Sequence, residues 1–153
     1  MPASFLPGKG NKVSSRLKDH AMHEFSLIDG AVLECGCVYI VKLLENVNLT
    51  DNLTGIANPK SSTGRLDVFT RLIVDGAMEF EEVPAGYQGP LYAEISPWTF
   101  SVLVRTGSRL NQLRLKRGQS FTSDKEIEIL QEHVGLVRNQ DNINLLDKIN
   151  NGV

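Results

Sequence analysis

The chain has 153 residues, an apolar fraction of 41% and a formal net charge of −2, which suits one globular domain with a hydrophobic core. It has no broad excess of basic residues, so we do not expect a general nucleic-acid binder. It also has no uncharged run of about 18 apolar residues, so we do not expect a membrane span. The first residues lack the apolar segment of a signal peptide, and the cytoplasm is the expected compartment.

Residues 1–20 are polar, and we expect a flexible N-terminal arm there. Short apolar runs follow, separated by turn signals such as Asp29-Gly30 and Asp75-Gly76. Many short strands at close spacing are typical of an all-β sandwich or barrel, and we expect this β domain to cover residues 21–120. The predicted strands lie at Val38–Val41, Leu66–Val74, Leu91–Ile95, Val102–Arg105 and Leu113–Lys116.

The two cysteines, Cys35 and Cys37, have one residue between them. This spacing suits neither a zinc knuckle nor a redox-active C-x-x-C pair. Because both stand in an apolar run, we expect small buried thiols.

The end of the chain changes character. Ser123 and Glu126 have the spacing of a capping box, and apolar residues at helical spacing follow them. We therefore expect a helix near Asp124–Val134 within a C-terminal segment of residues 121–138, and a linker or tail over residues 139–153.

The segment Asn58–Arg65 combines three hydroxyl groups, a lysine, an arginine and a glycine. Hydroxyl and amide donors beside an arginine are typical of a polyphosphate site. The residue order of a Walker loop is absent. An ordinary polar turn would use the same residues, so this segment alone leaves both interpretations open.

Two further motifs follow this segment. They are the G-Y-Q-G-P-L-Y-A-E run of residues 86–94 and the G-S-R-L-N-Q-L run of residues 107–113. Together with the S-S-T-G-R loop of residues 61–65, they resemble the dCTP deaminase and dUTPase superfamily. More narrowly, the chain resembles the first domain of the long, two-domain proteobacterial type of dCTP deaminase. The resemblance implies a dUTPase-like β-clip, a distorted jelly roll, with one C-terminal helix.

The resemblance also implies an activity, the hydrolytic deamination of dCTP to dUTP and ammonia. Glu94 takes the position of the general base that activates water, with Arg65 and Ser61 completing the implied catalytic set. The residues implied in substrate binding are Lys60, Ser62, Tyr87, Arg109 and Gln112.

Each of these residues has a plainer interpretation. Glu94 would otherwise be a solvent-facing strand glutamate, and Tyr87 either supports the deoxyribose or is a core aromatic beside a tight turn. Arg65 either holds the water and the pyrimidine or binds phosphate. Gln112 either bonds phosphate or packs at a subunit boundary, and the serines of the loop would satisfy the backbone of a turn.

Most nucleobase deaminases carry a zinc signature, H-x-E followed by P-C-x-x-C, and it is absent here. The three histidines have no cysteine or carboxylate partners at ligand spacing, so we expect no zinc and no protein metal site. Mg²⁺ is expected to bind through the triphosphate of the substrate. The resemblance further implies a homotrimer or pseudo-trimer with sites between subunits.

Two alternatives remain. A dUTPase, or a bifunctional enzyme that makes dUMP, would need an aspartate where this chain has Pro84, although Glu81 and Glu82 lie nearby. A non-catalytic nucleotide-binding domain is the other alternative, and the presence of Glu94 argues against it. The resemblance places a further strand before Met1 and a second domain after Val153, so we expect the chain to be a fragment.

Overall fold

The computed structural model describes residues 5–118 and 122–136. The chain divides into two compact units, residues 1–118 and 119–153, and each is described here by itself. The described part of the first unit has two helices and eight strands. They are α1 (Val13–His20), β1 (Ala31–Leu33), β2 (Tyr39–Asn48), β3 (Leu53–Pro59), α2 (Ser61–Gly64), β4 (Val68–Val74), β5 (Glu82–Val83), β6 (Gln88–Pro97), β7 (Val102–Val104) and β8 (Asn111–Arg117).

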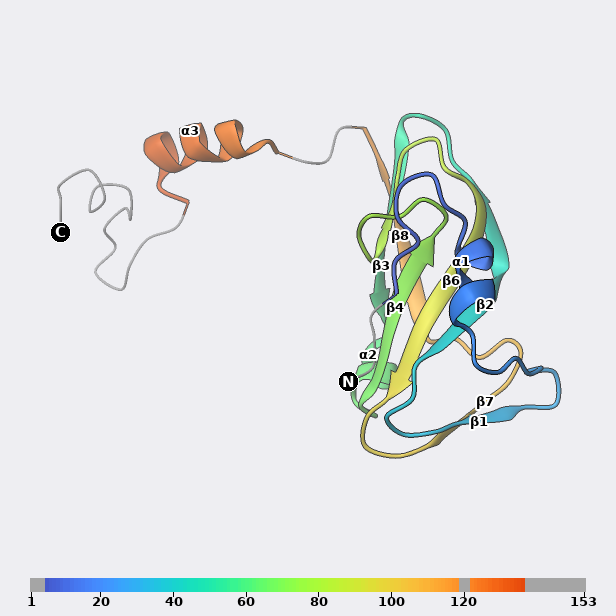
Figure 1. The fold of residues 1–153 in the computed structure, drawn as a ribbon. Coiled ribbons are helices and arrows are strands. Elements are labelled where there is room, and N and C mark those ends of the chain that lie inside the picture. The colour runs from blue at the N-terminus through green and yellow to red at the C-terminus, as the bar shows by residue number, and fades with distance from the viewer. Residues whose placement is uncertain (1–4, 119–121, 137–153) are drawn as a thin grey trace. The chain divides into compact units, whose positions relative to one another are not determined.

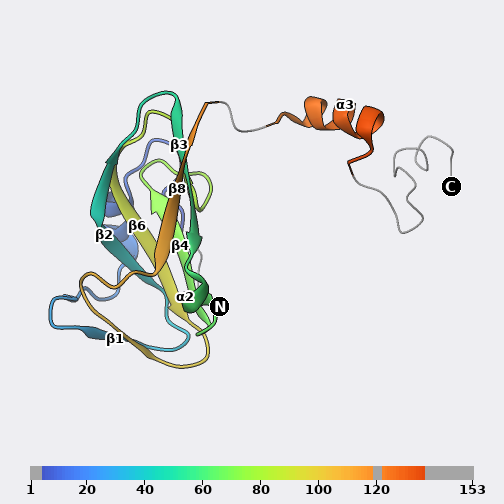
Figure 2. The same ribbon diagram turned by 180° about the vertical axis from the view of Figure 1, so that it is seen from behind.

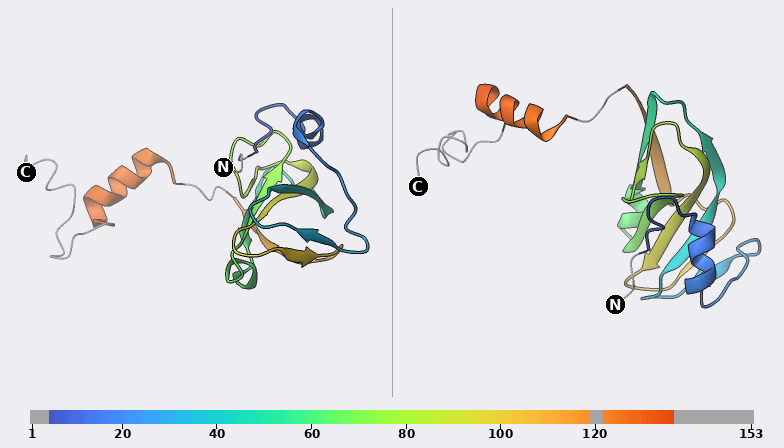
Figure 3. Two further views of the ribbon diagram at one scale, coloured as in Figure 1. Left: turned by 60° about the horizontal axis from the view of Figure 1, so that its bottom comes forward. Right: turned by 45° about the horizontal axis from the view of Figure 1, so that its top comes forward.

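The strands form three antiparallel sheets, in the orders β2-β6-β4, β5-β3-β8 and β1-β7. In Figure 1 the sheet with β6 lies toward the viewer. Figure 2 shows the molecule from behind, so that β3 and β8 lie in front. Seen along the strands in the left view of Figure 3, the sheets curve around a common interior. The predicted all-β class is confirmed.

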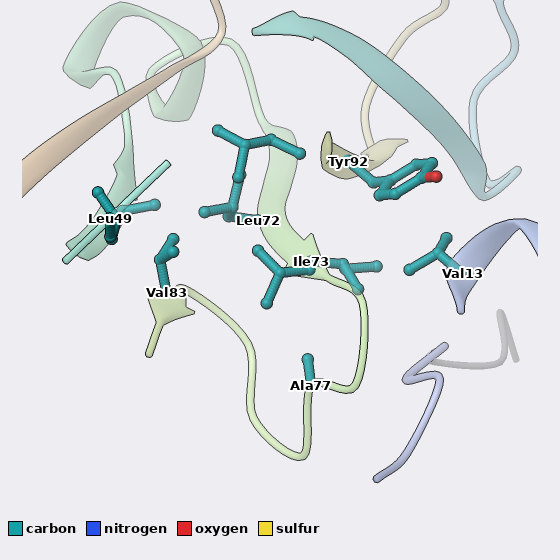
Figure 4. Packing of buried hydrophobic residues seen from close by; sticks show 10 residues of the cluster. Val13, Leu49, Leu72, Ile73, Ala77, Val83 and Tyr92 are labelled. Carbon is teal, nitrogen blue, oxygen red and sulfur yellow. The ribbon is translucent and has the colours of Figure 1, made fainter. Parts of the chain in front are cut away.

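The main core covers both faces of the sheet β2-β6-β4: one part lies against the sheet β5-β3-β8 and the other lies under the N-terminal segment. Leu72, Val83 and Leu49 are among its buried members, and Figure 4 shows them packed from different elements. A second cluster joins the β1-β7 sheet to the other end of β6 through Leu33 and Val104. Burial of aliphatic side chains such as these stabilises a fold by about 1.5–3 kcal/mol each.

The strand β6 is the centre of the fold because it pairs on both edges, with β2 and with β4. Its residues from Leu91 to Pro97 are all buried. Leu91, Ala93 and Ile95 face the interior clusters. By strand alternation Tyr92 and Glu94 point to the opposite face, so that face must be covered as well.

The N-terminal segment provides that cover. Val13 at the start of α1 is fully buried, and Figure 4 shows it beside Tyr92 and Ile73. Its backbone N–H donates to Asp75 Oδ1 at 2.8 Å, and Phe5, Leu6 and Leu17 also pack against the main core. The flexible arm predicted over residues 1–20 is therefore wrong for residues 13–20, since a few apolar side chains in a polar segment anchor a helix to the sheet.

The predicted strands are found with shifted ends. Leu66 and Asp67 precede β4 in a turn, where Asp67 has a positive φ of 52°. The cysteine prediction is wrong: Cys35 and Cys37 are exposed. They flank Gly36, whose φ of 78° makes a turn between β1 and β2, so the apolar run is interrupted at that point.

The described part of the second unit is α3 (Asp124–Val134). The predicted helix is confirmed with its capping box: the Ser123 hydroxyl accepts from the Glu126 N–H, and Glu126 Oε2 accepts from the Ser123 N–H at 2.8 Å. Gly135 ends the helix in the left-handed region. The predicted tail over residues 139–153 lies outside the described residues. Within the described ranges, no helix is long and apolar enough to span a membrane.

Candidate active site

Glu94 is buried in the middle of β6, with only 2% of its surface exposed. This rules out the plainer interpretation of a solvent-facing strand glutamate. Its Oε2 accepts a hydrogen bond from the backbone N–H of Phe5 at 3.1 Å, and its Oε1 accepts from the guanidinium of Arg71. A carboxylate at this depth needs such partners, because an unpaired buried charge is strongly unfavourable.

Arg71 on β4 stands directly opposite Glu94 in the strand register. Its Nε and Nη2 donate to the same oxygen, Oε1, at 3.2 and 2.5 Å. The guanidinium carbon also lies 3.6 Å from the ring centre of Phe80 and 4.7 Å from that of Phe69. The ion pair with Glu94 and the contacts with two aromatic rings therefore hold the Arg71 guanidinium in place.

Arg71 lies outside the three motifs, although the sequence contains a signal for it. Arg71 is the one charged residue in the otherwise apolar or uncharged run Val68–Val74, and Glu94 is the one charged residue in Gln88–Pro97. A single charge in a mostly buried strand needs an opposite charge nearby, and each of these two strands has one. Recognising this requires knowing that β4 and β6 are neighbours.

Glu81, just before β5, is a second carboxylate near Arg71. Its φ is 68°, an uncommon conformation for a residue with a long side chain. Burial raises the pKa of Glu81, while a backbone hydrogen bond from Leu72 and the charge of Arg71 partly oppose this. Within the described residues its Oε2 is buried and has no hydrogen-bond partner.

The loop that resembles a phosphate site folds as a single helical turn, α2. Thr63 is buried, and its hydroxyl donates to the Leu110 carbonyl oxygen at 3.1 Å. The backbone N–H of Lys60 donates to the same oxygen at 2.8 Å. Ser61, Ser62 and Arg65 are exposed. Thr63 and Lys60 thus anchor the turn, and Ser61, Ser62 and Arg65 are the side chains that it exposes to solvent.

The third motif lies beside this loop. Gln112 on β8 is opposite Asn58 on β3, and both are exposed. The Asn58 amide oxygen accepts from Arg114 Nη2 at 2.8 Å, which holds the strand that leads into α2. Arg109, also exposed, is the residue before Leu110, whose carbonyl anchors the loop. The structure therefore brings Lys60–Arg65, Arg109 and Gln112 to one end of the β unit.

Tyr87 lies near the other end of β6. Its ring packs against the main core, and its hydroxyl donates to the Pro90 carbonyl at 2.7 Å and accepts from the Asp75 N–H at 3.2 Å. Burial is the main cause that raises the pKa of Tyr87. These contacts agree with the interpretation of Tyr87 as a core aromatic residue. The role of Tyr87 as a platform for the deoxyribose stays a prediction.

The structure thus separates the predicted catalytic residues into two groups. Within the described part of the chain, no hydrogen bond or ion pair joins Glu94 to Ser61 or Arg65. The loop opens to solvent at the beginning of β4, and Glu94 is enclosed between β4 and the N-terminal segment. Figure 1 shows α2 at the end of the sheet where β4 begins.

Histidines contribute to neither group. The ring nitrogen Nδ1 of His20 lies 2.9 Å from the Arg16 carbonyl oxygen, and that of His133 lies 2.8 Å from the Ile129 carbonyl oxygen. No group of three or more His, Cys, Asp or Glu among the residues that the structure describes is arranged to hold a metal ion.

Comparisons with known proteins agree with the motif order. Residues 1–119 match the sequence profile of the 2'-deoxycytidine 5'-triphosphate deaminase (DCD) N-terminal domain. The chain is also similar to the crystal structure of 2'-deoxycytidine 5'-triphosphate deaminase from Agrobacterium tumefaciens. The identity is 49% and the TM-score 0.74, over 91% of this chain and 42% of that chain. The search of curated proteins gives no match. The predicted resemblance and the dUTPase-like fold are confirmed.

Proposed function

The chain belongs to the family of the dCTP deaminase N-terminal domain, and from that premise we propose that it takes part in the hydrolytic deamination of dCTP to dUTP and ammonia. The observation that carries this proposal is the Glu94 carboxylate, which is buried in a central strand and held by Arg71 and Phe5. The chain spans 42% of the length of the deaminase it resembles, so the activity of this chain by itself is part of the proposal.

In this scheme Glu94 is the general base. It takes a proton from water as the water oxygen bonds to C4 of the cytosine ring, and the proton is later delivered to the departing ammonia. Ser61 orients the attacking water, and Arg65 has two candidate roles, to orient that water or to bind the triphosphate. A fixed carboxylate can carry out both proton transfers without catalytic zinc, which agrees with the missing zinc signature.

The donors at the loop end, which are exposed apart from the half-buried Lys60, suit the triphosphate. Ser62 and the cationic side chains of Lys60 and Arg109 offer hydrogen bonds and positive charge to phosphate oxygens, and Gln112 adds an amide donor. These groups fit phosphate better than a metal ion, because their donor set has no carboxylate. Mg²⁺ bound to the triphosphate would neutralise part of its charge. Tyr87 remains the candidate for contact with the deoxyribose.

We further propose a homotrimer or pseudo-trimer in which the loop of one copy approaches Glu94 of another. The separation of the two groups within one chain supports this arrangement. Mixing two impaired variants at a low dCTP concentration tests it. If sites form between copies, Glu94→Gln and Arg65→Ala chains that are refolded together should be more active than the sum of the two separate chains. If sites form within one chain, the mixture should show only that sum.

A bifunctional reaction is the second candidate, since Glu81 is a half-buried carboxylate whose pKa is raised by burial. Such a group can act on a second water, although Pro84 stands at the position of the dUTPase aspartate. Incubation of the purified chain with dCTP and Mg²⁺, followed by chromatography, separates the possibilities. We expect dUTP and ammonia. The appearance of dUMP and pyrophosphate would favour the bifunctional enzyme, and unchanged dCTP would favour a non-catalytic domain.

A cytoplasmic location remains a prediction.

A further inference from the structure

The two carboxylate oxygens of Glu94 accept different numbers of hydrogen bonds. Oε1 accepts two hydrogen bonds, from Nε and Nη2 of Arg71 at 3.2 and 2.5 Å. Oε2 accepts one, from the Phe5 backbone N–H at 3.1 Å. Each carboxylate oxygen has about two lone-pair sites. Within the described residues, Oε1 is therefore saturated and Oε2 keeps one site for an incoming water.

Arg71 is itself held in place. Its guanidinium lies over the Phe80 ring at 3.6 Å and the Phe69 ring at 4.7 Å. Its backbone is fixed in β4 by direct pairing with the strand of Glu94. Its side chain is 24% exposed, whereas that of Glu94 is 3% exposed. The planar fork is thus oriented before any substrate arrives, which is the condition for preorganised catalysis.

We propose that Arg71 is the positioning residue of the candidate general base, and that Oε2 is the atom that receives the proton. The fork of Arg71 fixes the plane of the carboxylate and occupies Oε1. An O–H bond of water breaks and an Oε2–H bond forms, while the water oxygen bonds to C4 and the C4–N3 π pair moves to N3. The proton on Oε2 then goes to the amino nitrogen, the C4–N bond breaks to release ammonia, and the remaining hydroxyl proton ends on N3 as the C4 carbonyl forms. This inference rests on the proposed function, because it assigns a role through Glu94.

The test compares Arg71→Gln, Arg71→Lys and Arg71→Ala with Arg117→Gln, which changes an exposed arginine at the end of β8. A base displaced by about 1 Å loses roughly 100-fold in rate. We therefore expect Arg71→Gln to lower kcat about 100-fold with KM changed by less than about threefold. Arg71→Lys keeps the charge but loses the fork, and should recover only part of the loss. Arg117→Gln should match the parent.

Rescue with a small molecule separates positioning from folding. Arg71→Ala leaves a space beside the Phe80 ring that guanidinium ion fits. Millimolar guanidinium chloride is far below denaturing concentrations, and it should raise kcat of Arg71→Ala while leaving Arg117→Gln and the parent unchanged. A purely structural role would give no such rescue, since the variants would differ in folded fraction alone. Circular dichroism and urea midpoints measure that fraction.

A double-variant cycle keeps this inference distinct from the proposed function. If Arg71 acts through Glu94, then Arg71→Gln should add no further loss of turnover in a Glu94→Gln background. If the parent proves inactive toward dCTP, the proposed function fails. The assignment of Oε2 as the proton acceptor then fails with it. Urea unfolding of the same four chains still tests the pairing of Arg71 with Glu94, and there we expect a coupling of about tenfold in the unfolding equilibrium constant.

Two results would overturn the inference. One is a folded Arg71→Gln chain that turns over dCTP within about threefold of the parent rate, since a lost positioning residue should cost far more. The other is independent loss from Arg71→Gln and Glu94→Gln in both turnover and unfolding, which would show that the two side chains do not act together.

Discussion

The two polar regions of the β unit are built in opposite ways. The Glu94 carboxylate is buried and held by side chain and backbone donors from two other segments. The α2 loop is held through its backbone and the buried Thr63, while Ser61, Ser62 and Arg65 point to solvent. A fixed, desolvated group suits bond making, and exposed side chains on an anchored turn suit capture of a charged ligand.

The difference predicts different consequences of substitution. Changes at Glu94 should act on turnover, because the group is already in place and contributes during the reaction. Changes in the loop should act mainly on affinity, because exposed donors contribute when the triphosphate arrives. Four substitutions test this contrast, in order of decreasing expected effect.

The largest effect is expected for Glu94→Gln. This change keeps the shape of the side chain and removes its basicity, so kcat for dCTP should fall by about 10²–10⁴. Nucleotide affinity, measured by calorimetry, should stay close to that of the parent. Glu45→Gln is the matched control, because Glu45 is an exposed glutamate on β2. Parental turnover in Glu94→Gln would show that Glu94 is not the base.

The second effect is expected for Arg65→Ala. A charge-assisted hydrogen bond is worth about 1.5–3 kcal/mol, so affinity for a non-hydrolysable dCTP analogue should fall roughly ten- to a hundredfold. Arg65→Lys should recover little, because the planar fork is lost. Arg16→Ala, on the exposed face of α1, is the control. If turnover falls while affinity holds, Arg65 orients water instead.

The third substitution, Thr63→Val, tests how the loop is anchored. Thr63→Val removes the bond from the Thr63 hydroxyl to the Leu110 carbonyl, although the Lys60 N–H still donates to that oxygen. We expect a stability loss of about 1 kcal/mol and an affinity loss of about fivefold. Thr54→Val is the control, because the buried Thr54 hydroxyl has no partner within the described residues. Equal stability losses in urea unfolding of the two variants would contradict the anchoring role.

The contrast between the two regions also explains which features could be predicted from the sequence. The loop was found because its residues are adjacent along the chain. Helix α3 was found with its ends because capping is a local signal. These features depend on short-range patterns that propensity and spacing describe well.

Arg71 and the helix α1 could not be found in that way. The pairing of Arg71 with Glu94 depends on β4 lying beside β6, which is a long-range fact. The order of residues 13–20 depends on Val13 reaching the outer face of the sheet, although the segment itself is polar. The cysteine error has a local origin instead, because a turn at Gly36 interrupts the apolar run and leaves both thiols exposed.

The smallest effect is expected for Glu81→Gln. The quantity to measure is the pH dependence of the free energy of unfolding. Burial raises the pKa of Glu81 above its ordinary value of 4.5, so the folded chain holds this proton more tightly than the unfolded chain does. As pH rises from 4.5 through the folded pKa, the parent must lose stability, because it pays the cost of burying the charged form.

Glutamine has no proton to lose, so Glu81→Gln should gain stability relative to the parent as pH rises across that window. The charge of Arg71 favours the ionised glutamate and acts in the opposite direction, and because Glu81 is only half-buried the gain should be small. Urea unfolding of both chains at several pH values measures the difference, and Glu82→Gln on β5 controls for loss of a negative charge. A difference that stays constant with pH would show that the Glu81 carboxylate is solvated, and Arg71 would then serve Glu94 without competition from a second buried acid.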